Sequence, residues 1–256
     1  MSILEVIDIG KKREQDWVLH HINFDVQKGQ FIGLAGETGS GKTTLLKTIA
    51  GLLQADAGKV IYNGVKLKGP EEKLMPGHPE ISFLSQHFEL LNNYTVQEFF
   101  EIKRKVSLDK ANAIYAGCKI DHLLNRKTNS ISGGERQRIA LASELIKNPS
   151  VLLLDEPFSN LDAHHKTLIK DFLKEQSAKL GLTILMVSHD ARDILSWADF
   201  VLVLKNGTIL EKGSPGQISA FPKHKYTETL LGVDRNSPLL NWARSILSKL
   251  GAKFFF

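Results

Sequence analysis

The sequence predicts an α/β fold with a mostly parallel sheet. Short apolar runs of strand type occupy residues 31–35, 151–154 and 183–187, and segments with apolar residues at helical spacing lie between them. Strands that alternate with helices are typical of parallel sheets covered by helices on their faces. Asn-Gly pairs at 63–64 and 206–207, each between two strand-like runs, predict additional tight hairpins.

A glycine-rich segment joins the first of these strands to the first helical pattern. It consists of Gly36, Glu37, Thr38, Gly39, Ser40, Gly41, Lys42, Thr43 and Thr44. Glycines let a backbone fold closely around phosphates, so that successive N–H groups and the positive end of the helix dipole face the anion. Lys42 is expected to reach the β- and γ-phosphates, and the Thr43 hydroxyl to bind Mg²⁺. The segment predicts a nucleotide triphosphate site, and the alternative is a Gly/Thr-rich surface turn.

Two carboxylates and a histidine follow the other two strands. Asp155 ends the run at 151–154, where a carboxylate can hold Mg²⁺, and Glu156 is placed to orient and deprotonate an attacking water. His189 follows the run at 183–187, and parallel strands end at the same edge of a sheet. We therefore expect a catalytic cluster beside the glycine-rich segment. The alternatives are an acidic pair that caps a strand end and a surface histidine.

Ser132, Gly133 and Gly134 open another helical pattern. Ser132 with Glu135 three residues later fits a capping box, and the two glycines leave the helix N-terminus open to an anion. Capping alone does not explain the glycines, because glycine costs about 1 kcal/mol relative to alanine within a helix. This segment predicts a second phosphate contact.

With these motifs in this order, the sequence resembles the ATP-binding cassette (ABC) family from residue 1 to about residue 232. The resemblance implies a P-loop NTPase (RecA-like) core with a mostly parallel sheet, an antiparallel β subdomain, and an α-helical subdomain at about 88–146. The motifs similar to those of the family are the signature at 131–138, the Walker B strand and adjoining glutamate at 151–157, the D-loop at 159–162, the Q-loop residue Gln86 and the switch histidine His189.

The family resemblance also implies cofactors and partners. ATP and Mg²⁺ are expected, with Gln86 joining Thr43 and Asp155 as a metal or water contact and His189 near the γ-phosphate. Two cassettes of the same or a similar subunit would pair head to tail, so that the signature of each closes on the nucleotide of the other. A transmembrane permease subunit would contact the Gln86 region, and the ATPase would lie in the cytoplasm on the inner face of the membrane.

Base recognition departs from the family pattern. Where the family stacks adenine on an aromatic residue, counting back from Lys42 reaches Arg13, with Trp17 four residues later. A guanidinium also stacks on a base, so both residues are candidates, and an insertion in the turn at 12–16 would favour Trp17.

Composition narrows the function classes. The net charge is +5, but 33 basic residues are scattered among 28 acidic ones, so no nucleic-acid partner is expected. Cys118 is the single cysteine, which fits a reducing compartment. A transporter ATPase is favoured over a soluble ABC ATPase acting on nucleic acid or ribosomes, and over a P-loop kinase or GTPase, which would lack the signature. Within transporters, an importer is favoured over an exporter.

Residues 233–256 form an extension beyond the family resemblance. Leucine, isoleucine and alanine residues between 239 and 250 recur at helical spacing, which predicts an amphipathic helix. Packing on the cassette, a dimer contact and attachment to a membrane surface are the alternatives for its role.

Overall fold

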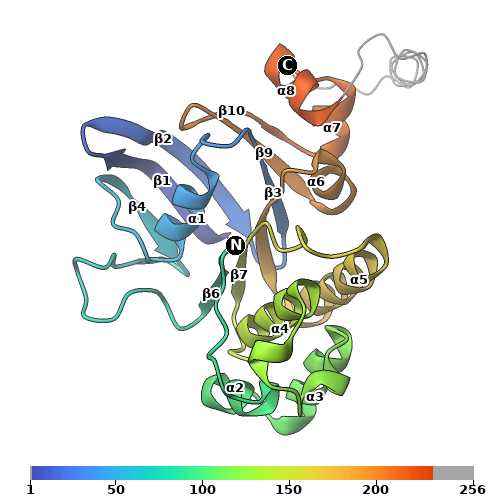
Figure 1. Cartoon of the computed structure of the whole chain (residues 1–256). Coiled ribbons are helices and arrows are strands. Elements are labelled where there is room, and N and C mark those ends of the chain that lie inside the picture. The colour runs from blue at the N-terminus through green and yellow to red at the C-terminus, as the bar shows by residue number, and fades with distance from the viewer. Residues whose placement is uncertain (1, 233–256) are drawn as a thin grey trace.

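The computed structural model describes residues 2–232. Its strands are β1 (Ser2–Arg13), β2 (Asp16–Gln27), β3 (Phe31–Ala35), β4 (Ala57–Tyr62), β5 (Val65–Lys66), β6 (Ile81–Leu84), β7 (Val151–Asp155), β8 (Thr183–Val187), β9 (Phe200–Lys205) and β10 (Thr208–Gly213). Its α-helices are α1 (Lys42–Ile49), α2 (Val96–Lys103), α3 (Leu108–Gly117), α4 (Gly133–Leu145), α5 (Ala163–Leu180), α6 (Ala191–Trp197), α7 (Pro215–Ala220) and α8 (Lys225–Leu231). The alternation of strands and helices confirms the predicted α/β class (Figure 1).

The centre of the described chain is a six-stranded sheet in the order β10-β9-β3-β8-β7-β6. Its strand pairs are parallel apart from the β9–β10 hairpin. Leu34 of β3 lies opposite Val187 of β8, and Val187 lies opposite Asp155 of β7. Because these three strands end at the same level, the residues that follow them meet at one edge of the sheet.

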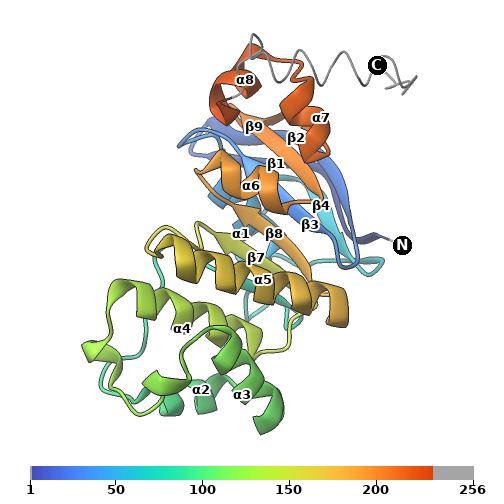
Figure 2. The ribbon, with the colours of Figure 1, turned by 90° about the vertical axis from the view of Figure 1, so that its right-hand side faces the viewer.

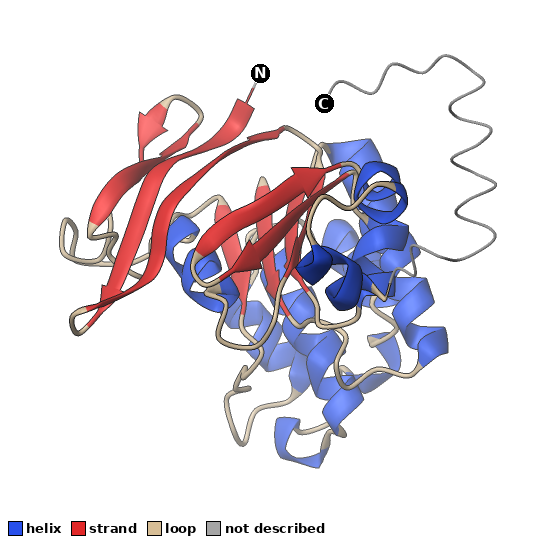
Figure 3. Cartoon of the chain, turned by 90° about the horizontal axis from the view of Figure 1, so that it is seen from above, coloured by secondary structure: helices blue, strands red, loops and turns tan. Residues whose placement is uncertain are grey.

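Both faces of the central sheet are covered, which explains why its strands are apolar throughout. Successive side chains of a strand point to opposite faces. Leu152 and Leu154 of β7 therefore pack in the cluster formed with α4, α5 and α6, whereas Val151 and Leu153 pack in the cluster formed with α1 and the antiparallel sheet. Figure 3 shows most of the helices on the side of the central sheet away from the antiparallel strands.

The antiparallel sheet has the order β2-β1-β4-β5. Asn63 and Gly64 connect β4 to β5, and Asn206 and Gly207 connect β9 to β10, with positive φ at all four residues. This conformation is that of the type I′ turn, which matches the twist of the flanking strands. Both predicted hairpins are confirmed. The antiparallel sheet is joined to the central sheet where the His20 N–H donates to the Gly207 carbonyl oxygen at 3.0 Å.

Helices α2, α3 and α4 gather at the end of the molecule remote from β1 and β2 (Figures 1 and 2). Phe100 of α2 stacks on Tyr115 of α3 with ring centroids 4.6 Å apart, and both rings belong to the cluster that also contains α4. These helices fall inside the range 88–146 predicted for a helical subdomain, whose boundaries stay a prediction.

The C-terminal part of the described chain consists of α7 and α8, which lie near α6 (Figure 2). The amphipathic helix predicted within residues 233–256 lies outside the described residues. Among residues 2–232, no helix is long and apolar enough to cross a membrane.

Candidate active site

The candidate site is built at the edge where β3, β7 and β8 end. The glycine-rich loop follows β3, Glu156 follows β7, and His189 follows β8 after one residue. The parallel register described above sets these positions, and the carboxyl ends of strands in such sheets are where ligands bind.

Close backbone approach explains two glycines of the loop. A Cβ on Gly41 would lie 2.7 Å from the Leu19 side chain, and its φ of 104° is also unfavourable for other residues. A Cβ on Gly36 would lie 2.5 Å from the Leu204 carbonyl oxygen at the end of β9. The loop therefore packs closely against β2 at Gly41 and against β9 at Gly36.

The loop has the features of an anion cradle. Lys42 Nζ donates to the carbonyl oxygens of Gly36 and Glu37, both at 2.7 Å. Helix α1 begins at Lys42 without a side-chain cap, so the N–H groups of its first turn have no acceptor within the helix. The buried Ser40 hydroxyl also has no hydrogen-bond partner among the described residues. These groups fit a phosphate, which would accept hydrogen bonds from them.

Burial affects the charge of Lys42. Desolvation lowers the pKa of its ammonium, although Glu156 and Asp155 act in the opposite direction. An anion bound beside a partly desolvated ammonium stabilises its charged form. The electrostatics of the loop thus agree with its backbone geometry.

Thr43 and Asp155 provide paired oxygen atoms beside the loop. The Thr43 hydroxyl donates to Asp155 Oδ2 at 2.8 Å, and burial raises the pKa of the Asp155 carboxyl. Hard oxygen donors of this kind suit Mg²⁺, which is usually bound by one or two protein groups together with phosphates and waters. Gln86 is exposed, two residues beyond the end of β6, and no hydrogen bond among residues 2–232 joins it to Thr43 or Asp155.

Glu156 and His189 form a direct pair. His189 Nδ1 lies 2.7 Å from Glu156 Oε2, although the two residues are far apart in the sequence. The backbone of Glu156 adopts a left-handed conformation with φ of 53°, and its N–H donates to the Val187 carbonyl oxygen at 3.1 Å. The turn after β7 thereby fixes the Glu156 carboxylate at the edge of the sheet where β3, β7 and β8 end. The structure brings together Glu156 and His189, two of the three residues predicted to act in catalysis, and the third is Lys42 of the glycine-rich loop.

Gln137 is a site residue that the sequence analysis missed. This side chain is 2 % exposed and makes contacts at both ends. Its Nε2 donates to the Glu156 carbonyl oxygen at 3.0 Å, and its Oε1 accepts from the Asn160 N–H at 3.0 Å. Gln137 therefore ties α4 to the turn that carries Glu156. The sequence signal that could have identified Gln137 is its position, as a polar residue, on the side of α4 that faces the core.

The segment at Ser132 has the predicted capping box. The Glu135 N–H donates to the Ser132 hydroxyl at 3.3 Å, and the Ser132 N–H donates to Glu135 Oε2 at 2.9 Å. A Cβ on Gly133 would meet no atom within 4 Å, whereas one on Gly134 would lie 3.0 Å from the Asn160 carbonyl oxygen. In the described chain, no hydrogen bond or ion pair joins residues 132–134 to the glycine-rich loop.

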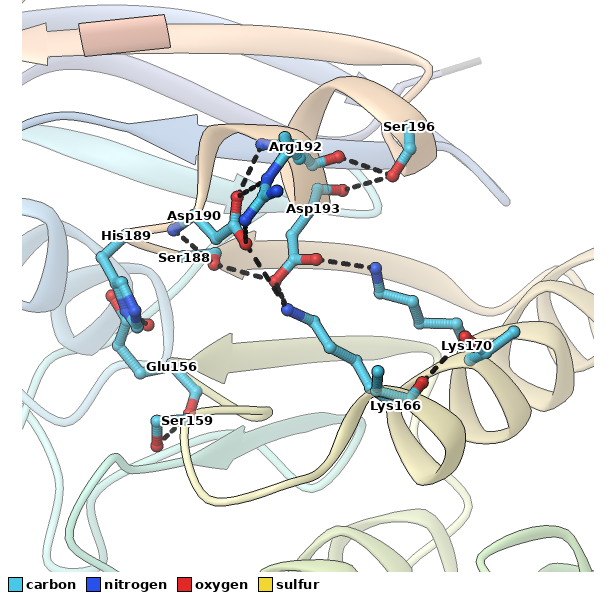
Figure 4. A network of polar contacts seen from close by, with 12 residues as sticks. Glu156, Ser159, Lys166, Lys170, Ser188, His189, Asp190, Arg192, Asp193 and Ser196 are labelled. Carbon is cyan, nitrogen blue, oxygen red and sulfur yellow. Dashed lines mark hydrogen bonds and ion pairs between the residues drawn. The ribbon is translucent and has the colours of Figure 1, made fainter. Parts of the chain in front are cut away.

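A buried ion network lies behind His189 and was also missed (Figure 4). Asp193 of α6 pairs with Lys170 at 2.9 Å and with Lys166, and both lysines belong to α5. The Ser188 hydroxyl donates to Asp193 Oδ2 at 3.4 Å and accepts from the Asp190 N–H at 3.1 Å. The two neighbours of His189 are thus held to α5, which begins directly after residues 159–162.

The two candidates for the adenine contact lie on one hairpin. Arg13 pairs with Asp16 across a two-residue turn, and the register of the two strands shifts between Lys11 and Lys12, next to this turn. The Trp17 ring lies against Gly10, is 46 % exposed and has Lys12 Nζ 4.7 Å from its centroid. Both candidates remain predictions.

Comparison with known proteins gives consistent matches. Residues 19–159 match the family model described as ABC transporter. The spermidine/putrescine import ATP-binding protein PotA of Clostridioides difficile is 34% identical over 238 residues, which cover 90% of this chain and 67% of that protein. The sulfate/thiosulfate import ATP-binding protein CysA of Pseudomonas syringae is 34% identical, with 91% and 73% covered. The molybdate/tungstate import ATP-binding protein WtpC of Pyrococcus horikoshii is 33% identical, with 91% and 68% covered.

Solved structures agree in fold. An ATP-binding cassette of an ABC transporter in its ADP conformation matches with a TM-score of 0.73 and 26% identity, covering 87% of this chain and 96% of that one. A dimeric cassette in a post-hydrolysis state, bound to ADP and Pi, matches with a TM-score of 0.72 and 25% identity, covering 83% and 98%. Together with the glycine-rich loop and the carboxylates Asp155 and Glu156 at the end of β7, these matches show that the chain belongs to the ABC transporter family, as one of its ATP-binding subunits.

Proposed function

We propose that this chain is the ATP-hydrolysing subunit of an ABC importer. The observation that carries the proposal is the Glu156–His189 pair at 2.7 Å, on the same strand edge as the Thr43–Asp155 pair and the glycine-rich loop. A base, a metal-ligand pair and an anion cradle on one edge are the parts that hydrolysis of a nucleoside triphosphate requires.

We assign the triphosphate to the backbone N–H groups and side chains of residues 36–44. Lys42 would exchange the carbonyl oxygens of its own loop for phosphate oxygens, since an anion is the stronger partner for an ammonium. Trp17 would offer a flat face to the adenine, and Arg13 is the alternative. Thr43 and Asp155 would hold Mg²⁺, and Gln86 is the further candidate for a contact with the metal or its water.

Glu156 would act as the base in hydrolysis. Its carboxylate would orient a water and take its proton while the water attacks the γ-phosphate, and Mg²⁺ would neutralise charge that develops on the phosphate oxygens. His189 holds the Glu156 carboxylate in place and, through its exposed imidazole, would contact the γ-phosphate.

The signature segment at Ser132, Gly133 and Gly134 would serve a second copy of the chain. It presents an open helix N-terminus, which favours anions, yet within residues 2–232 its hydrogen bonds stay in its own helix and cap. A head-to-tail pair would bring it to the γ-phosphate held by the partner's loop. The dimeric cassette among the structural matches supports this arrangement.

Membrane attachment would come from a permease subunit. Its contact with this chain is assigned to Gln86 and the segment 87–94, where Leu91 and Tyr94 are exposed. The relatives import polyamines, sulfate and molybdate or tungstate, cargoes of opposite charge. Cargo choice therefore belongs to other subunits, while this chain works on the cytoplasmic side.

Replacing Glu156 by glutamine tests the base. E156Q should bind MgATP as the wild type does but lose about 10²- to 10⁴-fold in turnover, because the water loses its proton acceptor while the cradle stays intact. K42A is the matched control, and its affinity for ATP should fall by about 10- to 100-fold because a charge-assisted contact is lost. Equilibrium titration and phosphate release measure both effects. Undiminished turnover of E156Q would refute the assignment.

Mixing two inactive variants tests the shared site. In a 1:1 mixture of S132R and K42A chains, about half of the dimers are mixed, and each mixed dimer has one composite site intact. Independent sites would then give about a quarter of wild-type turnover, measured as phosphate release. No activity beyond that of the separate variants would mean that each chain uses its own signature.

Replacing Asp155 by asparagine tests the buried carboxylate. A folded-state pKa above the ordinary value of 3.8 means that the charged form destabilises the fold, and this penalty grows as pH rises through the folded-state pKa. Without nucleotide at pH 7, D155N should melt a few degrees higher than the wild type, and the difference should vanish below about pH 4. Activation of hydrolysis by Mg²⁺ should decline sharply.

The variant D162N is a control for which we expect the opposite change in melting temperature. Hydrogen bonds from His165 lower the pKa of the Asp162 carboxyl to about 2, so its charge stabilises the fold above its unfolded pKa. D162N should therefore melt lower at pH 7. Equal melting temperatures of wild type and D155N across the pH range would contradict the role of the buried charge.

A further inference from the structure

A tyrosine of α8, the last helix within residues 2–232, contacts the glycine-rich loop. The Glu37 N–H donates to the Tyr226 hydroxyl at 2.9 Å, and this hydroxyl donates to the Leu204 carbonyl oxygen at 3.3 Å. Tyr226 and Glu37 are 189 residues apart in the sequence, so the contact depends on how α8 packs. The phenol uses its proton and a lone pair to bridge the loop and the end of β9.

The Tyr226 hydroxyl and Lys42 bind the same peptide group of the loop. The Glu37 N–H and the Gly36 carbonyl belong to one planar peptide unit. Tyr226 binds its N–H end, and Lys42 Nζ binds its C=O end at 2.7 Å. Rotation of this peptide would break both hydrogen bonds together, so Tyr226 fixes the carbonyl on which Lys42 rests.

The position of the tyrosine is itself determined by several contacts. Lys205 Nζ lies 4.5 Å from the centroid of the Tyr226 ring, and burial raises the pKa of the phenol, which keeps its proton available to Leu204. The neighbouring Thr227 is fully buried. Before α8, the Lys223 N–H donates to the buried Glu211 carboxylate at 2.9 Å. The chain is thus tied to β10 just before α8, and the residue that follows Tyr226 is buried.

We propose that Tyr226 is a positioning residue for the phosphate-binding loop: by binding the N–H of the Gly36–Glu37 peptide it preorganises the loop backbone and sets the affinity for the nucleotide. The proposal rests on nucleotide binding at this loop, as proposed above. Without the hydroxyl, the loop spends part of its time in other conformations, and the apparent affinity falls by the fraction that remains competent. Bound nucleotide restores the loop, so turnover at saturation is retained.

The variant Y226F removes the hydroxyl and keeps the ring. In the full-length chain we expect the dissociation constant and KM for ATP to rise by about two- to tenfold, as the loss of one hydrogen bond implies. The kcat should match that of the wild type. In the nucleotide-free chain, the Glu37 amide should exchange with solvent several-fold faster, while amides of β7 keep their rates.

The matched control is Y115F, which removes a hydroxyl from a buried tyrosine in the α2–α3 cluster and should leave all these quantities unchanged. A purely structural role of Tyr226 would lower the melting temperature and the active fraction, and hence kcat, without changing the ATP affinity of the folded chain. That result, or wild-type Glu37 exchange and affinity in Y226F, would overturn the proposal.

A different experimental result would show that the proposed function is wrong. If K42A bound ATP as tightly as the wild type, the loop would not be the nucleotide site. The exchange rate of the Glu37 amide would still report on Tyr226, because this measurement needs no nucleotide.

Discussion

The register of three parallel strands is the constraint on which the site depends. Leu34, Val187 and Asp155 lie side by side in β3, β8 and β7, so the chain leaves all three strands at one level. Hydrogen bonding between parallel strands sets this alignment, and a shift by one residue would turn each side chain to the other face of the sheet. The Thr43–Asp155 and Glu156–His189 pairs both follow from it.

Burial makes this edge electrostatically unfavourable until a ligand binds. Desolvation raises the pKa of the Asp155 carboxyl and lowers that of the Lys42 ammonium, so both charges are less stable here than in water. The hydrogen bonds from Lys42 to its own loop and from Thr43 to Asp155 offset part of this cost. A triphosphate with its metal would supply the missing counter-charges, which explains why a chain retains such groups in a buried position.

The sequence predicts the strands, loops and site residues better than it predicts the tertiary contacts that hold them in place. Strands, hairpins, the glycine-rich loop and the capping box at Ser132 follow from local patterns, and the structure contains each of them. The contacts of Gln137 and Tyr226 depend on which helix face packs against which loop. In a sequence, Lys170 is indistinguishable from a solvated helix lysine, yet it is 8 % exposed and paired with Asp193.

The adenine contact and the limits of the helical subdomain could not be predicted from local sequence patterns. The choice between Trp17 and Arg13 depends on the shape of a hairpin and on where a base would lie beside it. The limits of the helical subdomain depend on which contacts cross between α4 and the central sheet, and spacing carries no information about them.

A crystal structure of the E156Q chain with MgATP would show where the triphosphate and its metal bind. The proposed site predicts that Lys42 Nζ leaves the carbonyl oxygens of Gly36 and Glu37 for phosphate oxygens, with Thr43 and Asp155 at the metal. A triphosphate bound away from this strand edge, or one bound while Lys42 still contacts its own loop, would contradict it.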